Sequence, residues 1–450
     1  MEKIRKYLEE TFYLKDSDVC LNKLQEILTD KEKEEDAEER FLKKELRGLC
    51  ALLKKEGYDP TGKKKRIAGL IVSAMKEEME TIDFRTYPLK MISFEKEIAN
   101  QYRLVDLMHR HFDGYEALKE GDYGCHLLYG RPERTVRVEK VLAEYFESED
   151  CALVRGGGTG AIRALCFALI QKGDRILVHD APMYTTTKIT LEAMDVKIVK
   201  ADFNEFRSIE KALKEGIDVL YIQRVRQALH DRYDAIRIIE KVREIDPKVK
   251  IITDENYAVN KVRKLGSAAG ADASAFSAFK LLGIPGIGII TGTKKVIEEV
   301  HAQNYSGGGQ VQGPEASEVL RSLVNNPVLL AVQNASVDEI VKRLNQKEVA
   351  HVAKAIKANL EERIVLVRLD LPIAREVIEK AVELGALPHP VGSESRYEVQ
   401  ALFYRVAKVM LDEDPIYADF VIRINPMRSG PDTVIRILKE AIVTVLQERE

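Results

Sequence analysis

The feature that most constrains the fold is a regular alternation of short apolar runs and amphipathic segments between residues 137 and 257. Each apolar run is five to nine residues long and reads as a buried strand, and the segments between the runs carry helical spacing. The runs are CALVR (151–155), DRILVHD (174–180), VKIVKAD (196–202), DVLYIQRV (218–225) and VKIITDENY (249–257). This alternation predicts an α/β fold with a mostly parallel sheet and helices on both faces.

The chain on either side of this region has a different pattern. A long helical region is expected after Pro327, and the later segments ERIVLVRLD, REVIEKAVELGA, FVIRINP and PDTVIRILKEAIVTVLQE predict a smaller C-terminal α+β domain. Residues 1–82 mix acids and bases around a leucine stripe, which predicts a helical N-terminal extension that packs on its own core. The predicted units are residues 1–82, 83–330 and 331–450, the last including the helical connector.

Composition excludes several classes of function. The 450 residues carry a net charge of −3, so no basic face favours nucleic acid or an anionic membrane. Apolar runs are too short to span a bilayer, and the N-terminus lacks the apolar core of a signal peptide. Five cysteines without a CxxC pair are typical of reduced thiols in the cytoplasm. The scattered histidines predict no metal site.

Lys280 is the one charged residue in SAFSAFKLLGIPGIGII, residues 274–290. Taken alone, it is best interpreted as a lysine that ends a strand and extends its amine to water. An apolar setting would instead favour the neutral amine, which is a nucleophile and can form a Schiff base.

Two other elements change that interpretation. RGGGTGAIRAL, residues 155–165, joins a strand to a helix through glycines, and such a turn can bind a phosphate at the helix N-terminus. Asp254 ends an apolar strand, and Ser277 lies three residues before Lys280. Phosphate loop, aspartate and isolated lysine, in this order on a parallel sheet, match what pyridoxal 5′-phosphate (PLP) requires. The aspartate would keep the pyridine nitrogen protonated, Ser277 would offer a hydroxyl to the phosphate, and Lys280 would form the Schiff base.

At these residues the sequence resembles the fold-type-I PLP-dependent enzymes, and within them the enzymes of cysteine and methionine metabolism. The resemblance implies that Gly158, Thr159 and Gly160 bind the phosphate through backbone N–H groups. The segment YGRPERTVRVEKVLAEYF implies that Tyr129 and Arg131 reach the partner subunit's phosphate, and therefore a homodimer or a dimer of dimers. GDRILVHDAPMYTTT implies that Tyr184 stacks on the pyridine ring. VIRINP implies that Arg423 binds the substrate carboxylate.

From residue 83 to about residue 446 the chain is similar to the YhfS-type group of PLP enzymes, which carries an aminotransferase label. The motifs GTGAIRA, LVHDAP, HPVGSESRYE and the IRINP segment carry this likeness. YIQRVRQ is similar to a segment of the aluminium-resistance, methionine-γ-lyase-like proteins.

Two departures from the lyases bear on substrate choice. Phe279 replaces the threonine that usually precedes the lysine, and IQRVRQALHD replaces a Pro-x-Asn-Pro segment whose asparagine tunes the ring oxygen. Arg224, Arg226 or Gln227 could take that place, and an added cation would favour an anionic substrate group. The alternative for both arginines is a salt bridge to a neighbouring helix.

Two polar segments are further candidates. YSGGGQVQGPEA, residues 305–316, is either a connector or a loop that places Ser306 and Gln310 against the partner's cofactor, and we favour the second. HPVGSESRYE is either a surface loop or a segment that closes over substrate. Its polar side chains are His389, Ser393, Glu394 and Arg396.

The resulting expectation is a PLP-dependent enzyme that acts on an amino acid. Lys280 would take the Cα proton, Tyr184 could assist as an acid–base group, and Arg423 would orient the carboxylate. The lyase-like segments favour β- or γ-elimination. Aminotransferase and racemase activity remain open alternatives, as does a non-catalytic protein that binds PLP.

Overall fold

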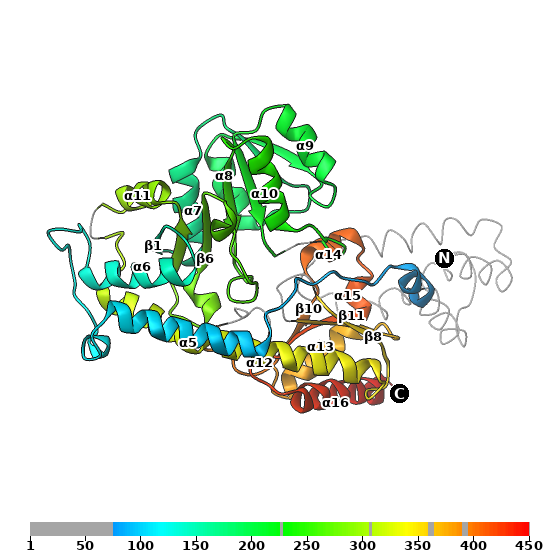
Figure 1. The fold of residues 1–450 in the computed structure, drawn as a ribbon. Helices are drawn as coiled ribbons and strands as arrows, with labels where there is room; N and C mark the ends of the chain where they lie inside the picture. The colour runs from blue at the N-terminus through cyan, green and yellow to red at the C-terminus, as the bar shows by residue number, and fades with distance from the viewer. Residues whose placement is uncertain (1–74, 226–227, 306–307, 359–363, 389–394, 450) are drawn as a thin grey trace, which may run out of the picture.

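The computed structural model describes residues 75–225, 228–305, 308–358, 364–388 and 395–449. These residues form two sheets with helices around each (Figure 1). The predicted N-terminal extension lies almost wholly outside the described residues, and its described end, residues 75–81, is helical. No helix among the described residues is both long enough and apolar enough to cross a membrane.

The large sheet has seven strands in the order β1-β7-β6-β5-β4-β2-β3. The pairs among β2, β3, β4, β5 and β6 are parallel, and β7 pairs antiparallel with both β1 and β6. The strands are β1 Asp150–Arg155, β2 Arg175–His179, β3 Lys197–Ala201, β4 Val219–Gln223, β5 Lys250–Asp254, β6 Ala273–Ser277 and β7 Ile287–Gly292. The mostly parallel sheet predicted from the alternation is thereby confirmed.

Helices cover both faces of this sheet because its strand residues alternate between apolar clusters on opposite faces. In β1, Ala152 and Val154 pack against α7 Gly157–Leu169, whereas Cys151 and Leu153 face the opposite cluster. The first face also carries α8 Thr185–Ala193 and α11 Lys294–Gln303. The second face carries α5 Phe94–His111, α6 Glu133–Tyr145, α9 Phe206–Lys214, α10 Ala235–Ile245 and the first half of α12 Gly313–Asn345.

The small sheet is antiparallel, in the order β10-β11-β9-β8. Its strands are β8 Val352–Lys357, β9 Val365–Leu369, β10 Leu402–Arg405 and β11 Val421–Asn425. The helices that accompany it are α13 Ala374–Glu383, α14 Lys408–Glu413, α15 Tyr417–Phe420 and α16 Pro431–Arg449. This arrangement confirms the predicted smaller α+β domain.

One helix connects the two sheets. Figure 1 shows α12 running beside α5 from the large domain toward α13 and α16. The helical region predicted after Pro327 is present, but α12 begins earlier, at Gly313, and continues through the buried Pro327. Proline removes one backbone hydrogen bond, but packing against both domains offsets that loss. We still propose domain limits of 83–330 and 331–450, with the change of domain inside α12.

Short 3-10 helices complete the fold: η1 Glu116–Leu118, η2 Ser267–Ala269 and η3 Ala278–Leu281. The last of them follows β6 directly and carries Lys280. The carboxyl ends of the parallel strands and the start of α7 meet at one edge of the sheet, which is where ligands bind in α/β sheets.

Candidate active site

Lys280 lies beside the phenol of Tyr257. Its Nζ donates to the Tyr257 hydroxyl oxygen at 2.5 Å and lies 4.2 Å from the centre of that ring. Tyr257 holds a left-handed backbone conformation, with φ at +64°, which is uncommon for a residue with a side chain. This turn after β5 brings the phenol against the amine. Sequence analysis missed Tyr257, although its position three residues after Asp254 at the sheet edge was a usable signal.

Asp254 is a buried carboxylate with hydrogen bonds to both oxygens. Tyr221 donates its hydroxyl to Oδ2 at 3.2 Å, and Asn256 donates its backbone N–H and its side-chain amide to Oδ1 at 3.0 and 2.8 Å. Burial raises the pKa of Asp254, although the hydrogen bonds from Asn256 and Tyr221 oppose that shift. A buried carboxylate of this kind is suited to sharing a proton with a ring nitrogen.

The glycine turn before α7 has the geometry of an anion site. Gly156 and Gly157 have φ values of +95° and +61°, and their N–H groups donate to the Gly286 carbonyl. Gly158 and Thr159 occupy the second and third positions of α7, where backbone N–H groups have no acceptor within the helix. Gly160 differs, because its N–H donates to the Gly156 carbonyl at 2.9 Å.

Ser277 connects this turn to the lysine. A β-carbon at Gly157 would lie 3.6 Å from Ser277 Oγ, so the two residues are neighbours. Ser277 Oγ accepts the N–H of Phe279, which caps η3, and leaves its own hydroxyl proton to donate. One cluster therefore contains an amine, a buried carboxylate and a helix N-terminus with a serine hydroxyl. These groups fit the aldehyde, the ring nitrogen and the phosphate of PLP.

Strand β4 brings a further side chain to this edge. Gln223 pairs in register with Asp254, so the two side chains share a face, and its amide donates to the Val225 carbonyl at 3.3 Å. Arg224 is buried, and its guanidinium donates to the Lys264 carbonyl at 3.4 Å, away from the Lys280 cluster. Gln223, which the sequence analysis overlooked, thus shares the Asp254 face with Tyr221, also on β4. Arg226 and Gln227 lie outside the described residues.

A second lysine is buried behind Tyr257. Lys261 is 1% exposed, and its Nζ lies 5.8 Å from the centre of the Tyr257 ring. Sequence analysis did not single out Lys261, because its neighbours in NYAVNKVRK include two further basic residues and suggest a solvated segment.

Tyr184 and Arg423 come from different domains. Tyr184 immediately precedes α8, which lies on the same face of the sheet as α7. Its side chain is 55% exposed, so the ring is accessible. Arg423 lies on β11, is buried, stacks 4.0 Å from the Tyr404 ring centre and donates to the Arg405 carbonyl at 2.7 Å. The small domain does reach Lys280's neighbour, because the ring centres of Tyr397 and Phe279 are 6.3 Å apart.

Tyr129 and Arg131 lie in a separate network of their own chain. Tyr129 stacks on His126 with ring centres 4.9 Å apart, and Arg131 Nε donates to the buried Glu139 at 2.8 Å. Gln310 donates to the Gly130 carbonyl at 2.5 Å, so it fixes the residue between them. Within the described residues, no hydrogen bond, ion pair or ring contact joins Tyr129 or Arg131 to the Lys280 cluster.

The two polar segments are only partly described. Ser306, His389, Ser393 and Glu394 lie outside the described residues. Arg396 is exposed, donates to the Tyr397 hydroxyl at 3.2 Å and sits over that ring. Because Tyr397 lies near Phe279, this end of the segment is beside the candidate site.

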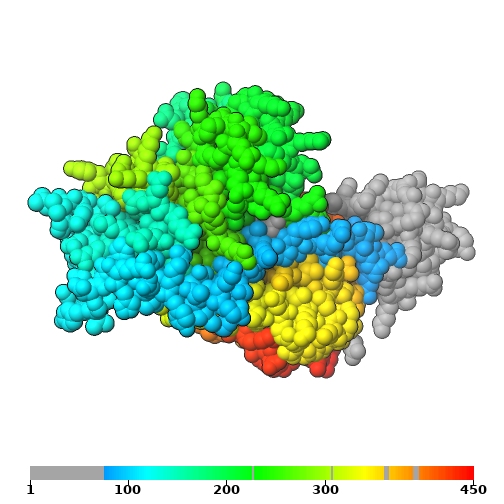
Figure 2. Space-filling view, in the orientation of Figure 1, coloured from blue at the N-terminus to red at the C-terminus, as the bar shows by residue number. Residues whose placement is uncertain are grey.

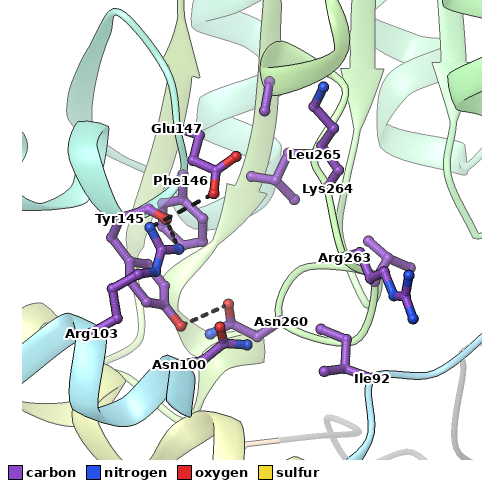
Figure 3. A pocket seen from close by; sticks show the side chains of 12 residues that line it. Ile92, Asn100, Arg103, Tyr145, Phe146, Glu147, Asn260, Arg263, Lys264 and Leu265 are labelled. Atoms are coloured by element: carbon purple, nitrogen blue, oxygen red, sulfur yellow. Dashed lines mark hydrogen bonds and ion pairs between the residues drawn. The ribbon is translucent and has the colours of Figure 1, made fainter. Parts of the chain in front are cut away.

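A pocket of about 50 Å³ lies elsewhere, between α5, the end of α6 and the connection from β5 to β6 (Figure 3). The Tyr145 hydroxyl donates to Asn260 within it, and Arg103 donates to the Tyr145 carbonyl. None of its lining residues belongs to the Lys280 cluster.

One group of described side chains has metal-like spacing. His179, Asp180 and Asp202 bring ligand atoms within 4.8 Å of one another, which sequence spacing did not indicate. Both histidine nitrogens are already engaged, because Nδ1 accepts the Phe203 N–H and Nε2 lies 3.0 Å from Asp231. We therefore interpret this group as a structural network between β2 and β3.

The chain belongs to the Cys/Met metabolism PLP-dependent enzyme family, whose pattern it matches over residues 111–362, more than half of its length. Residues 338–438 match the YhfS-like C-terminal domain. The chain is therefore a PLP-dependent enzyme with the fold-type-I architecture, as the sequence analysis predicted.

Individual relatives agree with this assignment. The YhfS protein of Escherichia coli (strain K12) is 42% identical over 362 residues, which span 80% of this chain and 100% of that protein. The crystal structure of the PLP-dependent protein YhfS from Escherichia coli has a TM-score of 0.78 and covers 80% of this chain and 99% of its own. A carbon–sulfur lyase involved in aluminium resistance from Clostridium novyi NT shares the fold at 18% identity and a TM-score of 0.59, covering 78% of this chain and 91% of its own.

Proposed function

We propose that this enzyme is a lyase that removes a leaving group from Cβ or Cγ of an amino acid, with PLP attached at Lys280. The observation that carries the proposal is the contact between Lys280 Nζ and the Tyr257 hydroxyl, beside a carboxylate and a helix N-terminus. In that cluster, the Lys280 amine would hold PLP covalently through the cofactor's aldehyde carbon.

PLP, when bound, supplies an electron sink that stabilises negative charge at Cα of an amino acid. The chain's own residues would do the rest. Asp254 would accept the ring N–H, and Ser277 with the N–H groups of Gly158 and Thr159 would hold the phosphate. The Lys280 amine would take the Cα proton of the bound amino acid.

Tyr257 extends this proton path. Its hydroxyl is within hydrogen-bond distance of Lys280 Nζ, so a proton can pass between the two groups without a water molecule. A phenol that receives the proton from Lys280 could deliver it to the departing heteroatom. This favours elimination over racemisation, in which a proton returns to Cα from the opposite face.

Substrate orientation is assigned to Arg423. A planar guanidinium can bind a carboxylate through two parallel hydrogen bonds. The Arg405 carbonyl and the Tyr404 ring hold Arg423 in place, and its guanidinium is the expected contact for the α-carboxylate.

A homodimer is part of the proposal. The lobe before α6 carries exposed apolar side chains and projects at the end of the molecule away from the small domain (Figure 2). These side chains are Tyr115, Leu118, Tyr123, Leu127, Leu128 and Tyr129. An apolar patch of this kind is typical of a protein interface, and a two-fold axis there would carry Tyr129 and Arg131 to the partner's phosphate.

We also retain the cytoplasm as the proposed location. Cys151 and Cys166 are buried as free thiols, and burial raises the pKa of Cys166 to about 12, so it is inert at neutral pH. Free thiols of this kind persist most simply in a reducing compartment.

The test is a screen of amino acids that carry oxygen, sulfur or phosphate at Cβ or Cγ, with separate assays for keto acid, ammonia, transferred amino group and inverted stereochemistry. The proposal predicts keto acid and ammonia together, with no need for a second keto acid. Product that appears only when an acceptor keto acid is added would identify an aminotransferase. Inversion alone would identify a racemase, and no turnover with PLP bound would identify a binding protein.

A further inference from the structure

Asn256 connects three separate parts of the candidate site. Its side-chain amide donates to Asp254 Oδ1 at 2.8 Å, and its Oδ1 accepts the backbone N–H of Ser277 at 3.0 Å. The same oxygen faces Gly158 in the first turn of α7, because a β-carbon built there would lie 2.5 Å away from it. One side chain therefore contacts the aspartate, the strand end before Lys280 and the glycine turn.

We propose that Asn256 is the positioning residue of this site, which fixes the Asp254 carboxylate and the glycine turn in the mutual arrangement that PLP requires. This inference rests on the proposed function, in which Asp254 accepts the ring N–H and the turn holds the phosphate. The inference goes beyond the proposed function because it assigns a role to Asn256, which acts through Asp254 and the glycine turn.

The physical basis is an amide with its donor and its acceptor both committed. A carboxylate oxygen that accepts two N–H groups from one residue has little freedom to rotate, so Oδ2 of Asp254 is held for its other partners. Tyr221 supplies one of those partners from β4. These hydrogen bonds favour the ionised carboxylate, whereas burial favours the protonated one.

Gly158 is explained by the same contact. Its backbone angle is not in the left-handed region, so backbone conformation does not require glycine there. Any larger residue at position 158 would collide with the Asn256 side chain. Asn256 would then have to turn away from Asp254 and Ser277. Glycine at this position is therefore required by Asn256, and this dependence can be measured.

The experiment is a double-mutant cycle of Gly158→Ala and Asn256→Ala, with the dissociation constant of PLP as the readout. Asn256→Ala is expected to weaken PLP binding by about tenfold to a hundredfold, the loss of one or two hydrogen bonds to a charged group. Gly158→Ala alone should weaken it comparably. In the Asn256→Ala background, Gly158→Ala should have no further effect, because the colliding atoms are gone.

Two control variants and two further readouts keep the result interpretable. Gly114→Ala, at a glycine with open space around it, and Asn100→Ala, on α5, should leave PLP binding unchanged. The same cycle is also measured as the melting temperature without PLP, which reports the Asn256–Gly158 contact in the apoprotein. The absorbance of bound PLP in Asn256→Asp provides a third readout, because that variant keeps the acceptor for Ser277 but opposes Asp254 with a second carboxylate.

The outcomes separate the two proposals. Additive effects of the two alanine substitutions, or an unchanged absorbance in Asn256→Asp, would overturn the role of Asn256 while the proposed function stands. Should the alanine variant fail to fold, the Asn256→Asp spectrum alone decides. Failure of the wild-type protein to bind PLP at Lys280 would instead overturn the proposed function.

Discussion

At the scale of single residues, the chemistry depends on how a few side chains are held after β5. Within four residues this turn supplies Asp254, Asn256 and Tyr257, and Tyr257 adopts a positive φ in order to meet Lys280. Strained backbone of this kind occurs where packing fixes it, often at functional sites. The contact between phenol and amine is thus a built feature, and its removal should change the reaction more than the fold.

Tyr257→Phe tests that contact. The variant keeps the ring and loses the hydroxyl, so it should retain PLP while turnover falls by about 100-fold, the usual size of a lost acid–base group. Steady-state kinetics and the visible spectrum of the same preparation measure the two effects. Tyr102→Phe, at an exposed tyrosine on α5, is the control. Unchanged turnover in Tyr257→Phe would show that the phenol has no part in proton transfer.

At the scale of elements, the site depends on the layer between β6 and the helices beneath it. Phe276 on β6 is fully buried and packs edge-on against Phe146 with ring centres 5.1 Å apart. The next residues along the chain are Ser277 and η3, which carries Lys280. The position of the lysine is therefore set by apolar packing on the opposite face of the strand.

Phe276→Ala should destabilise the fold by about 3–5 kcal/mol, because it removes a large buried ring and leaves a cavity. Chemical denaturation of the PLP-free protein measures this loss. Phe167→Ala is the matched control, since Phe167 is largely exposed on α7 and its loss should cost little. Equal effects of the two substitutions would contradict the assignment of Phe276 to the core.

Helix α6 carries a pH-dependent contribution to stability. Burial raises the pKa of Glu139 to about 7, although Arg131 and the Leu153 N–H oppose the shift. The unfolded value is about 4.3, so the folded state binds this proton more tightly. Stability from this group is complete below that unfolded value and is lost as pH rises toward 7.

Glu139→Gln should remove that loss because glutamine does not titrate, and its single side-chain oxygen can still accept from either Arg131 or the Leu153 N–H. The measurement is the melting temperature of both proteins at pH values between about 4.3 and about 7. As pH rises, the free energy of unfolding of the wild type should fall relative to that of the variant, by up to about 1.4 kcal/mol for each unit of pKa shift. The melting temperature of the wild type should fall with it. Parallel curves would show that folding does not raise the pKa of Glu139.

At the scale of the whole molecule, the proposal requires two chains to complete each site. Arg131 is held by Glu139 in its own chain and contacts no member of the Lys280 cluster among the described residues. The exposed apolar lobe beside it supplies a surface for a second copy. An arginine placed in this way is better positioned to bind the phosphate of the partner's cofactor than that of its own chain.

Subunit complementation tests this arrangement. Arg131→Ala and Lys280→Ala, each expected to be nearly inactive, should recover about a quarter of wild-type activity when co-assembled, because half the dimers are hybrids with one intact site. Arg423→Ala with Lys280→Ala is the control and should recover nothing, since both residues are assigned to one chain. No recovery in the first mixture would place Arg131 outside the partner's site.

Sequence reasoning predicted the sheet, its helices and the outline of the site, because strand alternation and the glycine turn are local signals. It failed where the structure depends on distant packing. The antiparallel strand β7 and the start of α12 follow from contacts that no short pattern records. Gln223 was overlooked because its neighbour Arg224 carried a charge, and Asn256 and Tyr257 because their roles depend on a turn.

The most direct test of the central claim is borohydride reduction of the PLP-bound enzyme, followed by peptide mapping with mass spectrometry. The account predicts loss of the visible band and a single reduced PLP adduct, located on Lys280 and absent in Lys280→Ala. Lys261 is the sharpest competitor, because it is buried within 6 Å of the same tyrosine ring. An adduct on Lys261, or no adduct in PLP-loaded wild type, would contradict the account.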